Sequence, residues 1–198
     1  ASRPDPATGK PDPAKQQAFA QRHPEIANFM AWAQSAPWSS SYANTAYNGV
    51  HAFRFTNAAG EARYVRWSFV PQAPFEDFPP EQRQAAEARY LADELAARLA
   101  EGPVRWTLAV TLAEDGDPIE DPSQPWPEAR TRVAAGTLVL ERAYAEADGN
   151  CRDINFDPTI LPGGIAASGD PVLAARAAAY AVSFNRRQRE RAAAGEGN

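Results

Sequence analysis

Cysteine, histidine and methionine are scarce in this chain, and the scarcity excludes several kinds of site. Its 198 residues include one cysteine, Cys151, so the chain can form no internal disulfide and carries no Cys/His zinc pattern. We expect Cys151 to be a buried, small apolar residue rather than a reactive thiol. Because no apolar run approaches the ~20 residues that a membrane helix needs, no membrane span is predicted.

A large excess of one charge is also missing. The chain has 20 basic and 25 acidic side chains, and its net charge of -5 argues against a nucleic-acid-binding surface. Residue 1 does not open a signal peptide, and the sequence does not indicate whether the compartment is cytoplasmic or periplasmic. With 44% hydrophobic residues, the composition is that of one globular domain.

The order of helix and strand patterns predicts an α+β chain. Residues 1–13 hold four prolines and are expected to be an irregular linker, and residues 14–198 are expected to belong to a single domain. Helices are predicted over 13–34, interrupted at His23-Pro24, and from 80 to 101. Strands are predicted at 50–56 and 62–70, joined as a hairpin, and at 104–112 and 137–144.

An acidic loop separates the last two predicted strands. It contains Glu114, Asp115, Asp117, Glu120 and Asp121. The order of ligands does not fit an EF-hand, which needs a glycine at its sixth position and a glutamate at its twelfth. We therefore interpret the loop as a solvated acidic turn.

A pattern near the C-terminus carries more chemical information. On a helix, Arg176, Tyr180, Phe184 and Arg187 project from one face, with the arginine one turn before the tyrosine. A guanidinium close to a phenol favours the phenolate, which is a strong oxygen ligand for ferric iron. A cation stacked on a half-buried ring is the alternative interpretation of the same spacing.

Three segments extend this pattern. They are residues 47–67, which contain His51; Pro125-Trp126-Pro127 followed by residues 136–140; and residues 155–165 followed by Asp170 and the 176–180 turn. Together they resemble the C-terminal half of the catalase family, in particular the small catalase-related haem peroxidases. The likeness covers roughly residues 40–190, and the last segment is the most specific.

The resemblance implies a catalase-like antiparallel β-barrel, of which this chain is the second half, with flanking helices and a C-terminal haem-binding helix. It implies that Tyr180 is the iron ligand of haem b (iron protoporphyrin IX) and that Arg176 hydrogen-bonds the phenolate. His51 and Asp170 then form a relay behind that arginine, and Arg187 pairs with a haem propionate. The residues implied to pack on the haem are Phe156, Pro158, Leu161 and Val172, with Phe184 where large catalases have a histidine.

One element of the family pattern is missing from the sequence. Catalases carry a distal histidine in an Arg-x-x-His-Ala-x-Gly context, and no residues here match it. The other histidine, His23, precedes Pro24 in a polar stretch and is expected to lie at a helix boundary. We therefore expect this chain to be a fragment, inactive or impaired alone, that is stable only against the missing N-terminal half, supplied as a separate polypeptide or by a second copy.

These implications define the expected function. The resemblance predicts a haem-dependent peroxidase or catalase that acts on hydrogen peroxide and an organic electron donor, with this chain supplying the proximal side. One alternative is a haem-binding or carrier module with tyrosinate ligation and no peroxide turnover. Another is a haem-free structural remnant. The partners expected are hydrogen peroxide, an organic electron donor and the missing half, and a homo-oligomer is a further expectation.

Overall fold

The computed structural model describes residues 8–145 and 148–195, and the chain divides into two compact units, Ala1–Pro37 and Trp38–Asn198. The first unit holds α1 (Pro13–Arg22), the 3-10 turn η1 (Pro24–Ile26) and α2 (Ala27–Ser35). The carboxylate of Asp12 caps α1 by accepting a hydrogen bond from the Ala14 amide at 2.9 Å. His23 lies between the two helices, so the predicted interruption at His23-Pro24 is confirmed.

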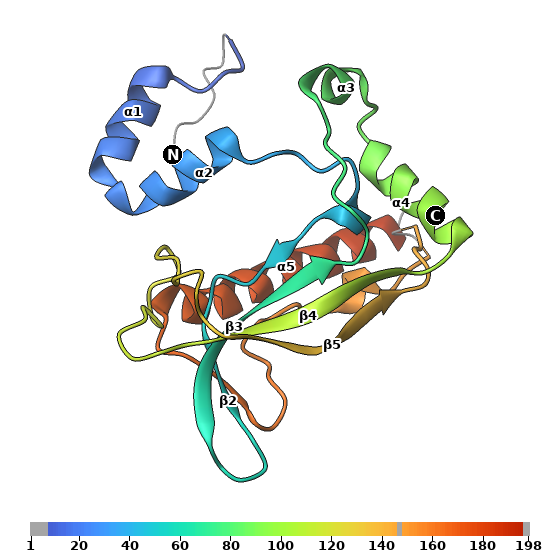
Figure 1. Cartoon of the computed structure of the whole chain (residues 1–198). Helices are drawn as coiled ribbons and strands as arrows, with labels where there is room; N and C mark the ends of the chain where they lie inside the picture. The colour runs from blue at the N-terminus through green and yellow to red at the C-terminus, as the bar shows by residue number, and fades with distance from the viewer. Residues whose placement is uncertain (1–7, 146–147, 196–198) are drawn as a thin grey trace. The chain divides into compact units, whose positions relative to one another are not determined.

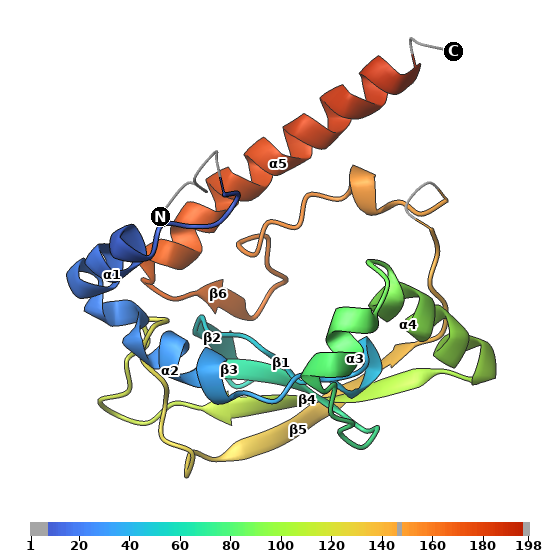
Figure 2. The same ribbon diagram turned by 90° about the horizontal axis from the view of Figure 1, so that it is seen from above.

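The second unit is built on a six-stranded antiparallel sheet (Figures 1 and 2). Its strands are β1 (Tyr47–Asn48), β2 (Phe53–Thr56), β3 (Ala62–Pro71), β4 (Val104–Leu112), β5 (Arg132–Leu140) and β6 (Ile165–Ala167). The order across the sheet is β5-β4-β3-β2-β6, and β1 pairs with β3. Within the described residues, β5 and β6 therefore leave two open edges.

The hairpin between β2 and β3 confirms a sequence prediction. Thr56 faces Ala62 across the turn, and the backbone amide of Asn57 donates to the Glu61 carbonyl. The side chain of Asn57 accepts hydrogen bonds from the Ala59 and Glu61 amides, each at 3.0 Å. Gly60 has a φ of 82°, which a residue with a side chain rarely adopts. The turn thus fixes the register of the two strands.

Other element bounds differ from the prediction. The helix expected from 80 to 101 is two helices, α3 (Pro80–Ala85) and α4 (Tyr90–Glu101), because the chain turns between them and stacks the Tyr90 ring on Phe78. The strand expected at 137–144 is β5, which runs from Arg132 to Leu140. It starts earlier than predicted because Arg132 pairs with Thr111 and the pairing with β4 continues to Val104. The short strands β1 and β6 were not predicted, since two or three residues carry no periodic signal.

The C-terminal helix α5 (Pro171–Gly195) follows β6 directly. In Figure 2 the segment that joins β5 to β6 runs between α5 and the sheet. This segment contains Cys151, which is exposed, so the expectation of a buried cysteine was wrong. Its 3-10 turn η3 (Cys151–Asp153) packs against α5 through the Gln188 amide, which donates to the Arg152 carbonyl at 3.2 Å.

Within the ranges 8–145 and 148–195, no helix has the length and apolar character of a membrane span. No group of three or more His, Cys, Asp or Glu side chains in these ranges is arranged to hold a metal ion.

The sequence predicts that the acidic loop between β4 and β5 is a solvated turn. One of its carboxylates, Asp117, is instead shielded from solvent. The Asp117 side chain is 3% exposed, and both of its oxygens accept hydrogen bonds from the Arg130 guanidinium at 2.9 Å. The carboxylate also accepts from the Glu114 amide. These contacts, the Arg130 hydrogen bonds foremost, hold the pKa of Asp117 below its usual value.

This contact predicts an acid-sensitive part of the stability. Because the pKa of Asp117 is lowered on folding, its contribution is complete above the unfolded pKa of about 4 and is lost as the pH falls through the folded pKa. We expect the wild type to exceed Asp117→Asn in free energy of unfolding near pH 6, with the gap closing toward pH 2. Urea titrations over this range measure the gap, and a gap independent of pH would contradict the prediction.

Candidate functional site

The predicted site begins at the N-terminus of α5, where Asp170 is the residue before the helix. Its side chain is 1% exposed, and its Oδ1 atom accepts hydrogen bonds from the Val172 amide at 2.8 Å and the Leu173 amide at 3.2 Å. Pro171 opens the helix, a position that needs no N–H donor. Asp170 is therefore the N-cap of α5, where a negative charge also favours the helix dipole.

His51 lies against the same carboxylate. Its Nδ1 atom is 2.6 Å from Asp170 Oδ2, and both side chains are buried. The pair is brought together by the pairing of β2 with β6, in which Phe53 faces Ala167, so that the residues just before β2 meet those just after β6. The two residues are 119 positions apart in sequence. The relay that the resemblance implied also includes Arg176, and as a relay it stays a prediction.

The second pair, Arg176 and Tyr180, lies further along α5. Arg176 Nη2 donates a hydrogen bond to the Tyr180 hydroxyl oxygen at 2.9 Å, and the guanidinium carbon is 5.3 Å from the centre of the phenol ring. One lone pair of the phenol oxygen is thus engaged by a group that keeps its positive charge. Among the described residues, no hydrogen bond joins Arg176 directly to His51, so the two pairs are linked through the helix.

Arg187 connects α5 to the segment before β6. Its Nη1 atom donates to Ser183 Oγ and its Nη2 atom to the Ile154 carbonyl, both at 2.8 Å, and its guanidinium lies 5.9 Å from the Phe184 ring centre. Its Nε atom is buried and has no hydrogen-bond partner. Sequence reasoning missed Ser183, although the spacing of four residues from Arg187 on a helix was the available signal.

Large apolar side chains stay exposed close to these residues in the chain. Phe156 is 51% exposed and Val172 is 52% exposed, while Pro158 and Leu161 are half-buried. Val172 precedes Arg176 by one helical turn and shares its face of α5. Val172 therefore adds exposed apolar surface to the face of α5 that carries Arg176.

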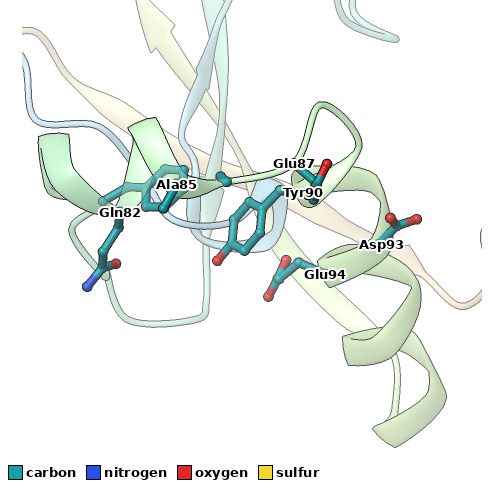
Figure 3. A pocket seen from close by; sticks show the side chains of 8 residues that line it. Gln82, Ala85, Glu87, Tyr90, Asp93 and Glu94 are labelled. Atoms are coloured by element: carbon teal, nitrogen blue, oxygen red, sulfur yellow. The ribbon is translucent and has the colours of Figure 1, made fainter.

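A hollow of about 720 Å³ lies elsewhere, between α3 and α4 (Figure 3). Its lining includes Tyr90, Asp93 and Glu94 and no residue of α5. Asp93 already pairs with Arg89, and Glu94 with Arg98, so two of its carboxylates are neutralised from within the chain. None of the site residues predicted from the sequence lines this hollow.

Comparison with known proteins decides the family. The catalase family model matches residues 1–193. The chain belongs to the catalase family. It is 42% identical to the catalase-related peroxidase of Synechococcus elongatus over an alignment of 189 residues. The alignment covers 96% of this chain and 56% of that protein. It is 38% identical over 148 residues to the catalase-related peroxidase of Mycolicibacterium paratuberculosis, covering 75% of this chain and 47% of that protein.

Solved catalase structures share the fold. A bacterial catalase superposes with a TM-score of 0.78 at 22% identity over 92% of this chain and 38% of that one. A fungal catalase superposes with a TM-score of 0.68 at 22% identity over 75% of this chain and 32% of that one. The chain therefore has the predicted α+β catalase-like fold, and it spans about half the length of the curated relatives it matches.

Membership of the catalase family implies a haem cofactor, and the residues on α5 fit one. A phenol that accepts a hydrogen bond from a guanidinium is a suitable donor for ferric iron. The exposed Phe156 and Val172 side chains offer apolar surface for a flat macrocycle, and the unpartnered Nε atom of Arg187 leaves one guanidinium donor for an anion.

Proposed function

We propose that this chain supplies the iron-ligand side of a haem-dependent peroxidase or catalase that acts on hydrogen peroxide. The observation that carries the proposal is the Arg176–Tyr180 hydrogen bond of 2.9 Å on α5, one helical turn after the exposed side chain of Val172. The names of the relatives, catalase-related peroxidase and catalase, support the reaction class. We further propose that the cofactor is haem b.

Each residue of the proposed site has a separate task. Tyr180 offers its oxygen to the iron, and Arg176 stabilises that oxygen as an anion. Arg187 offers a planar donor to a carboxylate at the haem edge. When bound, haem iron supplies the redox chemistry that splits peroxide. The residues proposed to pack on the ring are Phe156, Pro158, Leu161, Val172 and Phe184.

In this proposal His51 and Asp170 do not contact the haem but position the helix that carries its ligand. Asp170 fixes the first turn of α5, and His51 satisfies its second oxygen, so the helix that carries Tyr180 keeps one position. A buried carboxylate that is hydrogen-bonded on both oxygens has little freedom to move. We propose that this rigidity holds Arg176 and Tyr180 at a constant distance from the iron.

The acid/base group for peroxide cleavage comes from outside this chain in our proposal. Of its two histidines, His51 is bound to Asp170 and His23 Nδ1 is 2.8 Å from Glu25. An apolar groove of about 350 Å³ on the sheet, with Phe55, Val110 and Val133 in its lining, offers a surface for the missing part of a barrel. We propose that an N-terminal half, on a separate polypeptide or a second copy, covers it.

A haem carrier without peroxide turnover is the second candidate for the chain taken alone. The sequence favours it, because no residues here match the Arg-x-x-His-Ala-x-Gly context in which catalases carry the distal histidine. Residues 14–198 would then form the C-terminal half of a domain whose catalytic half is elsewhere.

One experiment separates these functions. The chain is loaded with haemin, and peroxide consumption is measured with an organic donor, alone and after adding the part of the Synechococcus elongatus relative that this chain does not match. We expect haem binding in both samples and a rate at least about 10²-fold higher in the mixture, since general acid/base help is worth ~10² to 10⁴. Haem binding with no peroxide consumption in either sample would support the carrier, and no haem binding would contradict both.

A further inference from the structure

Arg66 on β3, which is partly buried, organises the loop between β4 and β5. Its Nη1 atom donates to the Gln124 carbonyl at 2.8 Å, and its Nη2 atom donates to the Pro118 and Asp121 carbonyls, each at 3.2 Å. The guanidinium carbon lies 4.5 Å from the Trp126 ring centre. One planar group therefore fixes three separate points of the loop, which a lysine ammonium has no means of doing in the same geometry.

Partial burial of the Arg66 guanidinium disfavours its positive charge, and nearby carboxylates offset this effect. Burial lowers the pKa of Arg66, while the carboxylates of Asp117, Asp121 and Asp170 act in the opposite direction. The Nε atom of Arg66 is also buried without a hydrogen-bond partner. One of these three carboxylates, Asp170, is the N-cap of α5.

The loop that Arg66 holds also touches the start of that helix. A Cβ atom added to Gly169 would overlap the carboxylate of Glu120, so the Glu120 side chain lies directly against the Gly169 backbone. Gly169 immediately precedes Asp170. Arg66 thus fixes the loop to β3 on both sides of Glu120, and Glu120 rests on the residue before the N-cap.

We infer that Arg66 is a positioning residue for the site on α5. Through the loop from Pro118 to Trp126 it holds the Gly169–Asp170 backbone, and thereby the carboxylate that caps α5 and binds His51. The link from there to Tyr180 rests on the proposed function. Arg66 touches neither Arg176 nor Tyr180 through any hydrogen bond of the described residues, so its effect passes through Asp170.

Hydrogen exchange in the full chain without haem tests the inference directly. The Val172 and Leu173 amides donate to Asp170, so their exchange rates report whether the N-cap stays in place. We expect Arg66→Ala to speed exchange of both amides by about tenfold or more, because it removes hydrogen bonds from a charged donor. Arg105→Ala, at an exposed arginine on the neighbouring β4, is expected to leave both rates unchanged.

Two further variants keep the test decisive if Arg66→Ala fails to fold. Arg66→Lys keeps the charge but loses the planar set of donors, and Glu120→Ala removes only the contact with Gly169. We expect both to speed exchange of the two amides. Wild-type rates in Arg66→Lys would mean that the charge alone acts, and wild-type rates in Glu120→Ala would mean that the loop does not support the helix. Either result would overturn the inference.

A haem-loaded sample separates this inference from the proposed function. If both hold, Arg66→Ala shifts the visible absorption of the iron-phenolate centre as well as the exchange rates, and Arg105→Ala shifts neither. Faster exchange with an unchanged spectrum would confirm the positioning of Asp170 and contradict its link to Tyr180. An unchanged exchange rate in Arg66→Ala would overturn the inference whatever the spectrum shows.

Discussion

Tyr180→Phe is expected to abolish stable haem binding by the chain. The substitution removes one oxygen atom, the atom that accepts the Arg176 hydrogen bond at 2.9 Å and that we propose as the iron ligand. The ring stays, so the packing of α5 changes little. Titration with haemin, followed by the intense Soret absorption of bound ferric haem, measures the effect as a loss of the band or a large rise in Kd.

A matched variant separates ligation from a general effect of removing a hydroxyl. Tyr144→Phe makes the same chemical change at a side chain that is 67% exposed and lies outside α5, so it is expected to bind haem as the wild type does. Arg176→Leu is expected to retain some haem but to alter its spectrum, because the oxygen keeps its place and loses its charged donor. Equal haem content in Tyr180→Phe and wild type would disprove the ligand assignment.

Asp170→Ala is expected to have the largest effect on folding. The carboxylate is 1% exposed, accepts two amide hydrogen bonds at the start of α5 and binds His51 at 2.6 Å. Removing one member of a buried, hydrogen-bonded pair costs about 3 to 5 kcal/mol. Urea unfolding of the haem-free chain measures this loss in the free energy of unfolding, and it should occur with or without haem.

Two controls define the origin of that loss. Asp93→Ala removes an exposed carboxylate that pairs with Arg89 at 3.5 Å, and such a pair is worth at most about 1 kcal/mol. Asp170→Asn keeps an oxygen for the helix amides, so it is expected to be less damaging than Asp170→Ala, with the remaining loss due to the His51 contact. A loss for Asp170→Ala no larger than that for Asp93→Ala would show that the buried pair contributes little.

The strands that sequence reasoning located were those with strong local signals. Alternation of apolar residues marked β4 with its observed bounds, and Asn57 with Gly60 marked the hairpin turn. The start of β5 was misplaced because only its pairing with β4 determines where it begins. Cys151 was expected in the core because cysteine usually packs there, yet its segment lies at the surface beside α5.

The residues in and around the candidate site also differ in whether a local sequence pattern marked them. Arg176 and Tyr180 were found from sequence because helical spacing alone brings them within reach of each other. Asp117 was assigned to a solvated turn because no local pattern connects it to Arg130, thirteen residues away. The support of Arg66 for the loop also left no local signal, since its hydrogen bonds go to backbone carbonyls that any residue type can supply.

The sequence by itself determined the family resemblance, the face of α5 that carries Arg176 and Tyr180, and the absence of an Arg-x-x-His-Ala-x-Gly segment from these 198 residues. Tertiary structure alone decided that His51 meets Asp170 across 119 positions and that a loop anchored on Arg66 rests against Gly169. The physical reason is that helix and turn preferences act over a few residues, whereas the pairing of β2 with β6 and the burial of charge depend on the whole sheet.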